Sequence, residues 1–338
     1  MAHLERHPFS EPWWLRGRHL QTVWAPLFRV PPVTPSVRAE RVDTHDGDFF
    51  CIHVQEGKPR HPMVLLLHGL EGSFRSKYIL GLHHQFGNLG WSVVTMEFRS
   101  CSGEMNRARR IYHMGETSDL DFLIRQFIAT RPDVELYAAG FSLGGNVLAK
   151  WLGEQGEQAP VQVKAAAIIS APYDCVVSAP YLDRPTARLY RQKFLKSLVP
   201  KALEKERQYP GAIDVRRIRR CTTFAEYDTY VTAALHGFKD ARDYWAKASC
   251  GRFLPNVRRP TMLLSAADDP FSPGITLPRA HAAGSAWLHP QFTDTGGHVG
   301  FVYGPNPWQA RFWAEEQTVR FFQAYHAQDH FSDSGNPA

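Results

Sequence analysis

Apolar and polar residues follow one another along the chain in a pattern that predicts strands and helices in regular succession. Short apolar runs typical of buried strands lie at 63–67, 91–98, 134–139, 163–170, 261–265 and 287–292. Apolar residues with helical spacing lie at 76–88, 116–130, 146–154 and 308–325. Strand followed by helix, several times over, predicts an α/β protein with a mostly parallel central sheet and helices on both faces.

Two further sequence features modify the predicted parallel sheet. The segments 37–42 and 49–54 flank the turn His45-Asp46-Gly47-Asp48, which predicts a hairpin and an antiparallel N-terminal edge of the sheet. Between the strands at 163–170 and 261–265 the chain is rich in Arg, Lys and Tyr, has helical segments and shows no clear strand. Because this stretch is far longer than a usual connection, we expect an inserted helical lid.

The predicted organisation is therefore a core formed by residues 1–171 and 260–328 and a lid formed by residues 172–259. The polar end of the chain, residues 329–338, is expected to be disordered.

Composition narrows the class of protein without identifying a partner. The chain has 338 residues, of which 43% are hydrophobic and 21% charged, as in an ordinary globular protein. Its net charge of +6 indicates no particular ligand. The five cysteines are scattered and odd in number, which favours a reducing compartment and a cytoplasmic location. Neither a secretory signal nor an apolar run of about 20 residues is found, so no membrane span is expected.

One short motif carries the main chemical signal. Gly140-Phe141-Ser142-Leu143-Gly144 matches G-x-S-x-G, and it follows a predicted strand and precedes a predicted helix. In this context the motif is typical of the nucleophile elbow of the α/β-hydrolase fold, where a sharp turn exposes the serine Oγ. Ser142 is therefore the predicted nucleophile.

A neutral serine needs a base to take its proton, and in this fold the order along the chain is serine, acid, histidine. His298 lies in the loop Gly296-Gly297-His298-Val299-Gly300 after the last predicted strand, which is where the base is expected. His289 on the strand, and His326 and His330 near the C-terminus, are the weaker alternatives.

The acid is expected after the strand before that, where Asp268 and Asp269 are adjacent. Neighbouring side chains in a loop point in different directions, so only one of them can hold the histidine Nδ1–H. Asp269 lies four residues before Pro273, a spacing found in many hydrolases of this fold, and this favours Asp269 as the acid, with Asp268 bracing the loop. Two backbone N–H groups should form the oxyanion hole: that of Leu143, and that of Leu70 in the loop His68-Gly69-Leu70-Glu71-Gly72.

The chain resembles the YheT-like branch of the α/β-hydrolases, bacterial relatives of the animal α/β-hydrolase-domain lipases and phospholipases. The resemblance runs from about Pro8 to Phe322 and is carried by the elbow and by further blocks. These blocks are HGLEGS (68–73), GGHVGF (296–301), PWWLRGRHLQT (12–22), FRSCSGE (98–104), NR (106–107) leading to YHMGE (112–116), and FAEYD (224–228) with Gly237-Phe238. The resemblance implies ester hydrolysis with Ser142, Asp269 and His298 as the triad. The chain departs from the pattern at Met105 and Met114, and an N-terminal membrane anchor like that of the animal relatives is not expected.

These observations predict a serine hydrolase that cleaves short- to medium-chain carboxylic esters or lipid-like esters, with water as the second substrate and no cofactor. A thioesterase, an amidase, an acyltransferase, or a non-catalytic binding protein on the same scaffold are the alternatives. The sequence makes no prediction about the oligomeric state.

Three other features of the sequence are expected to be structural or exposed and to have no part in catalysis. The aromatic and basic segment 13–28 is expected to pack across the body of the protein, with contact to a membrane surface or the lining of an acyl channel as the alternatives. The run Arg216-Arg217-Ile218-Arg219-Arg220 is short and lacks interleaved aromatic residues, so no nucleic acid partner is expected. His83 and His84 are adjacent and cannot bind one metal ion from a helix, so no metal site is expected.

Overall fold

The computed structural model describes residues 8–32 and 36–333, with side chains up to residue 328. Its centre is an eight-stranded sheet with the order β1-β2-β4-β3-β5-β6-β7-β8. The strands are β1 (Arg38–Asp43), β2 (Phe49–Gln55), β3 (Met63–Leu67), β4 (Ser92–Glu97), β5 (Leu136–Phe141), β6 (Val163–Ile169), β7 (Thr261–Ala266) and β8 (Leu288–Thr293). β1 and β2 pair antiparallel, β2 joins β4 antiparallel, and the other pairs are parallel.

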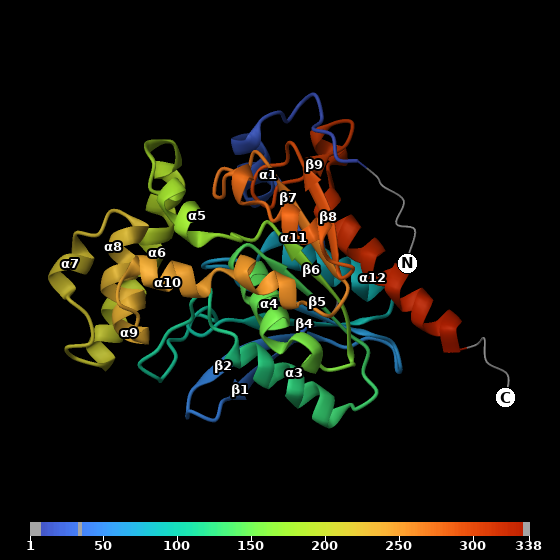
Figure 1. The fold of residues 1–338 in the computed structure, drawn as a ribbon, viewed down its shortest axis with the longest axis horizontal. Coiled ribbons are helices and arrows are strands. Elements are labelled where there is room, and N and C mark those ends of the chain that lie inside the picture. Colours follow the sequence, from blue (N-terminus) through green and yellow to red (C-terminus); the bar gives the residue numbers. More distant parts are fainter. Residues whose placement is uncertain (1–7, 33–35, 334–338) are drawn as a thin grey trace.

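Helices cover both faces of this sheet (Figure 1). One face packs against α3 (Ser118–Thr130) and α4 (Leu143–Gln155), and the other against α2 (Lys77–Asn88) and α12 (Trp313–Asp333). β3 is buried along its whole length because alternate side chains enter the two opposite cores: Leu65 lies on the α3 and α4 side and Leu66 on the α2 and α12 side. A continuous apolar run is what a strand covered on both faces requires.

This arrangement is the α/β-hydrolase fold, and it confirms the predicted mostly parallel sheet with an antiparallel N-terminal edge. The fold places the C-terminal ends of β5, β7 and β8 at one edge of the sheet. The loops that follow these strands carry Ser142, Asp269 and His298.

Between β6 and β7, residues 172–259 form helices and no strand, and all of these residues are described. We call them the helical segment. It contains α5 (Cys175–Leu182), α6 (Arg188–Gln208), α7 (Val215–Arg219), α8 (Phe224–Tyr227), the π-helical turn η3 (Asp228–Ala233), α9 (Ala234–His236), α10 (Ala241–Ala248) and the 3-10 helix η4 (Cys250–Asn256). Most of these helices gather beside one end of the sheet (Figure 1) and share a small apolar core that also includes Ile111.

The two ends of the chain differ in detail from the sequence-based prediction. The closing helix, predicted from residue 308, begins at Trp313, because residues 302–312 form the short hairpin β9 (Val302–Tyr303) and β10 (Arg311–Phe312). α12 continues to Asp333 and so includes the first part of the tail predicted to be disordered. No Pro or Gly interrupts this stretch before Gly335, and residues 334–338 lie outside the described residues.

The N-terminal helix α1 (Arg18–Phe28) has no counterpart among the predicted elements. It follows Gly17, which adopts a left-handed φ of 95°, and it packs against the loop after β8 and against the β9–β10 hairpin. α11 (Arg279–Ala283) lies between β7 and β8.

Candidate active site

Ser142 occupies the turn between β5 and α4. Its backbone has a φ of 52° and a ψ of −118°, a conformation that non-glycine residues rarely adopt. Such strain persists only where the surroundings enforce it, and it is the backbone signature of a nucleophile elbow. The turn brings the serine side chain to the surface of a cavity, which it lines together with Leu143 and His298.

Two glycines make this turn possible. A Cβ on Gly140 would lie 2.4 Å from the carbonyl oxygen of Gly144, and a Cβ on Gly144 would lie 2.5 Å from the carbonyl oxygen of His68. The backbone of the elbow therefore lies in close contact with its own next turn and with the loop after β3, so neither Gly140 nor Gly144 can be replaced by a residue with a side chain.

Ser142, His298 and Asp269 form one hydrogen-bonded chain. The His298 Nδ1–H donates to Asp269 Oδ2 at 2.7 Å, and this leaves Nε2 as the acceptor that faces Ser142 Oγ at 2.9 Å. Asp269 is 3% exposed, and its Oδ1 accepts from the N–H groups of Phe271 and Ser272. The Phe271 ring stacks on the imidazole with a centroid distance of 4.1 Å. The carboxylate and the imidazole are thus both held in orientation.

Asp268, the alternative acid, contacts a different part of the same loop. Its Oδ1 accepts from the Gly297 N–H at 3.0 Å, directly before His298. Burial raises the pKa of Asp268 above its usual value, while that hydrogen bond opposes the shift. The structure therefore places Asp269 against the imidazole and Asp268 against the backbone that carries it.

Helix α1 supports the histidine loop, a contribution that the sequence analysis did not foresee. The His298 N–H donates to Thr22 Oγ1 at 2.9 Å. The Gln21 side chain accepts from the Val302 N–H at 2.8 Å and donates to the Val302 carbonyl at 3.0 Å. The only sequence signal for this role was that both residues end the block PWWLRGRHLQT. The buried face of this N-terminal segment packs on the body of the protein.

The loop after β3 lies beside the elbow, with Gly69 close to the Ser142 Cβ. The N–H groups of Gly69 and Glu71 donate to the hydroxyls of Tyr78 and Tyr112. Within the described part of the chain, the intervening Leu70 N–H has no acceptor, and neither has the Leu143 N–H at the start of α4. Two free donors next to the serine are the feature that an oxyanion hole requires.

The His68 side chain stabilises the loop after β3 through two hydrogen bonds. Its Nδ1–H donates to the Gly69 carbonyl at 2.7 Å, and its Nε2 accepts from the Phe98 N–H at 3.2 Å. Because the side chain is fully buried, its pKa is lowered to about 4, so the imidazole is neutral and acts as a structural link.

Glu71 connects the same loop to the helical segment. Its carboxylate accepts from the Tyr112 hydroxyl at 2.7 Å, from Lys201 Nζ at 2.8 Å, and from the Ser197 hydroxyl. Lys201 and Ser197 both belong to α6. Glu71 itself has a left-handed φ of 55°. The position of α6 and the conformation of the loop are therefore coupled through one carboxylate.

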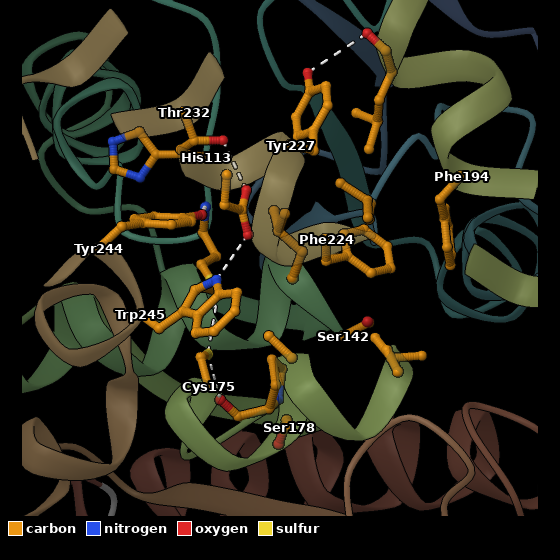
Figure 2. A pocket seen from close by; sticks show the side chains of 18 of the residues that line it. His113, Ser142, Cys175, Ser178, Phe194, Phe224, Tyr227, Thr232, Tyr244 and Trp245 are labelled. Atoms are coloured by element: carbon orange, nitrogen blue, oxygen red, sulfur yellow. Dashed lines mark hydrogen bonds between the residues drawn. The ribbon is translucent and has the colours of Figure 1, made fainter. Parts of the chain in front are cut away.

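The cavity that Ser142 lines has a volume of about 140 Å³ and extends under the helical segment (Figure 2). More than half of its lining residues come from that segment, and most are apolar or aromatic, among them Leu182, Phe194, Leu198 and Phe224. Met114 is also part of the lining, whereas Met105, the other departure from the family pattern, is not.

The remaining candidates lie away from this site. His83 is buried and bonds Gln55 and Thr95 through its two ring nitrogens, while His84 contacts Asn88 on the outside of α2. The four arginines at 216–220 are exposed on and after α7. Among the described residues, no helix is both long enough and apolar enough to cross a membrane.

The fold and the hydrogen-bonded serine, histidine and aspartate define the chain as an α/β-hydrolase. Solved structures with the same fold include the esterase Pf2001 of Pyrococcus furiosus, with a TM-score of 0.55 and 14% identity over 87% of this chain and 95% of that one. They also include an acylaminoacyl peptidase of Pyrococcus horikoshii, with a TM-score of 0.51 and 12% identity over 88% of this chain and 42% of that one. Likeness at such identities shows the fold and not the reaction.

Relatives in sequence are more specific. YheT of Escherichia coli (strain K12), an esterase by provisional assignment, is 35% identical over 312 residues, which cover 91% of this chain and 90% of YheT. Phospholipase ABHD3 of Bos taurus is 31% identical over 310 residues, 89% of this chain and 74% of the relative. A monoacylglycerol lipase of Saccharomyces cerevisiae is 27% identical over 273 residues, 78% of this chain and 60% of the relative. None of the protein-family models matches the chain.

The chain therefore belongs to the YheT-like family of α/β-hydrolases, and its class of activity is ester hydrolysis.

Proposed function

We propose that this protein is a serine hydrolase that cleaves carboxylic esters through an acyl-enzyme, with Ser142 as nucleophile, His298 as base and Asp269 as the group that orients the histidine. The observation that carries the proposal is the hydrogen-bonded chain of these three residues at the wall of an apolar cavity. A serine with a histidine acceptor 2.9 Å away, itself held by a carboxylate, is activated for attack on a carbonyl.

The positions of these atoms support the following reaction. His298 Nε2 takes the Ser142 proton as Oγ attacks the ester carbonyl, and the tetrahedral oxyanion accepts hydrogen bonds from the Leu143 and Leu70 N–H groups. His298 then protonates the leaving alcohol. Water, activated by the same imidazole, attacks the acyl-serine and releases the carboxylic acid. The Asp269 carboxylate stabilises the imidazolium that forms in each half-reaction.

The substrate that we propose is an ester with a short- to medium-length apolar acyl group or a lipid-like ester. The apolar lining of the cavity supports this class, and so do the lipase and phospholipase names of two relatives. We further propose that the helical segment, residues 172–259, serves as a lid over a core formed by residues 1–171 and 260–328, since it supplies most of the cavity wall.

The test is hydrolysis of p-nitrophenyl esters from acetate to palmitate by the wild type and by Ser142→Ala. We expect turnover of at least one chain length by the wild type and a loss of at least about a thousandfold in the variant. A fluorophosphonate probe should label the wild type at Ser142 only. Absence of both turnover and labelling would remove the esterase proposal in favour of a binding protein on a hydrolase scaffold.

A further inference from the structure

A single carboxylate interrupts the largely apolar wall of the cavity. Asp228, a residue of intermediate exposure, begins the π-helical turn η3 in the helical segment and lines the same cavity as Ser142. Thr232 and Trp245, both labelled in Figure 2, each donate a hydrogen bond to this carboxylate. π-helical turns are rare and occur frequently at functional sites.

The partners of Asp228 are neutral. Trp245 Nε1–H donates to Oδ2 at 2.7 Å, and the Thr232 hydroxyl donates to Oδ1 at 2.8 Å. No Lys, Arg or His in the described part of the chain forms an ion pair with Asp228. Lys201, the one Lys or Arg among the residues that line this cavity, is already paired with Glu71 at 2.8 Å. Each Asp228 oxygen therefore keeps acceptor capacity toward the cavity.

Aromatic side chains surround this carboxylate. Tyr227, Tyr244 and Trp245 line the cavity beside it and are almost fully buried, with exposures of 3%, 4% and 5%. A carboxylate and several aromatic side chains on one cavity wall are a combination that binds ammonium groups, because the rings and the carboxylate both attract positive charge while the apolar surface accepts N-methyl groups.

A purely structural role accounts for only part of this arrangement. The bonds to Trp245 and Thr232 fix the π-helical turn, but a neutral asparagine oxygen would accept the tryptophan N–H equally well. A carboxylate without a cationic partner inside the protein lowers stability, so the negative charge needs another reason.

We propose that Asp228, Tyr227, Tyr244 and Trp245 form a subsite for a positively charged ammonium group carried by the ester substrate. This inference rests on the proposed function, because Ser142 and the subsite line one cavity, and it narrows the substrate class to cationic or zwitterionic esters. The ester carbonyl is held at Ser142, and the ammonium group lies among Tyr227, Tyr244 and Trp245 and pairs with Asp228.

Ligand binding tests the subsite without any chemical step. Choline and 3,3-dimethyl-1-butanol have the same shape and differ in charge, and calorimetry can compare their binding to the wild-type protein at about pH 8. We expect choline to bind at least about tenfold more tightly than its neutral isostere, and Asp228→Asn to remove this preference. Asp174→Asn, a carboxylate-to-amide change at the N-cap of α5 outside the cavity lining, should retain it.

Equal binding of the two alcohols to the wild type would overturn the subsite, and this result needs no variant to fold. Undiminished choline preference in Asp228→Asn would also overturn it.

Kinetics identify which part of the substrate carries the cation. Butyrylcholine and 3,3-dimethylbutyl butyrate place the charge on the alcohol, whereas p-nitrophenyl 4-(trimethylammonio)butanoate and p-nitrophenyl 5,5-dimethylhexanoate place it on the acyl group. We expect kcat/KM to favour the cationic member of one pair by at least about tenfold and Asp228→Asn to abolish that ratio. Faster hydrolysis of the neutral member in both pairs would contradict the subsite. Charge-selective choline binding without hydrolysis of any ester would instead leave the subsite standing and refute the proposed function.

Discussion

Asp268 and Asp269 are adjacent in the chain but hold different parts of one loop. Asp269 Oδ2 accepts from the His298 imidazole at 2.7 Å, while Asp268 Oδ1 accepts from the Gly297 backbone at 3.0 Å. The two carboxylates therefore have separable effects on the chemistry that we propose.

Asp269→Asn should reduce kcat by about 10⁴-fold. The amide would retain an oxygen for the N–H groups of Phe271 and Ser272, but its NH₂ would face His298 Nδ1 and hold the imidazole in the tautomer that cannot accept the Ser142 proton. Asp268→Asn keeps an acceptor for the Gly297 N–H and should lower kcat by less than about tenfold. Ester kinetics of the two variants decide which aspartate orients His298, and similar losses of kcat in both would contradict the role proposed for Asp269.

Glu71→Gln should lower kcat by about 10- to 100-fold with a smaller change in KM. The substitution weakens the attachment of Lys201 and Ser197 to the loop that carries the Leu70 N–H, and a displaced oxyanion donor acts mainly in the transition state. Glu104→Gln is the matched control, because Glu104 is exposed and pairs only with Arg41 in the described contacts. A change confined to KM would show that Glu71 affects substrate binding and not the oxyanion donor.

Gly144→Ala should prevent correct folding or abolish activity. The added Cβ would lie 2.5 Å from the His68 carbonyl oxygen, which belongs to backbone and cannot move aside cheaply. Gly284→Ala is the control, since its Cβ would meet only the Ala280 carbonyl oxygen at 3.6 Å. Circular dichroism and ester turnover of both variants provide the comparison, and a fully active Gly144→Ala protein would show that the elbow is less crowded than described.

The sequence contained most of this architecture for a simple physical reason. Strands covered on both faces are continuous apolar runs, and the helices that cover them have one apolar stripe, so periodicity reveals both. Helix α1 breaks this rule. It buries Gln21 and Thr22 and exposes Leu20, Leu27 and Phe28, so its hydrophobic pattern points away from the body of the protein. Its buried face carries the polar Gln21 and Thr22 beside Ala25, because these two side chains hydrogen-bond the histidine loop.

The candidate active site likewise has parts that the sequence predicted and parts that it did not. The elbow and the histidine loop could be predicted because their glycines and their order along the chain are local features. The cavity could not, because it is assembled from side chains of several separate segments between Leu70 and His298. Asp228 was visible only as the last residue of the FAEYD block, and its partners Thr232 and Trp245 become apparent only once the helical segment is folded.

Arg99→Met should reduce the free energy of unfolding by about 3–5 kcal/mol. Arg99 is 2% exposed and binds Asp48 and Asp119, so its removal leaves the buried Asp48 without its cation and Asp119 with only the longer contact to Arg110 at 3.5 Å. Urea denaturation measures the loss, and Arg38→Met, at an exposed position of β1, should change the stability by less than about 0.5 kcal/mol. Equal stability of the two variants would show that the buried pairs are offset by their desolvation.

Asp228→Asn should change how stability depends on pH. Burial and the like charge of Asp183 raise the pKa of Asp228 to about 6 from its usual 3.8, although the bonds from Trp245 and Thr232 oppose the shift. The folded protein therefore holds this proton more tightly than the unfolded chain, and the free energy of unfolding falls as the pH rises from about 4 to about 6 and stays lower above that.

The asparagine variant lacks this titratable group. Urea denaturation of both proteins at about pH 5 and pH 8 should show the wild type losing about 1–1.5 kcal/mol relative to Asp228→Asn. If the difference in free energy of unfolding between the two proteins is the same at both pH values, the pKa of Asp228 is not raised and its charge is compensated inside the protein.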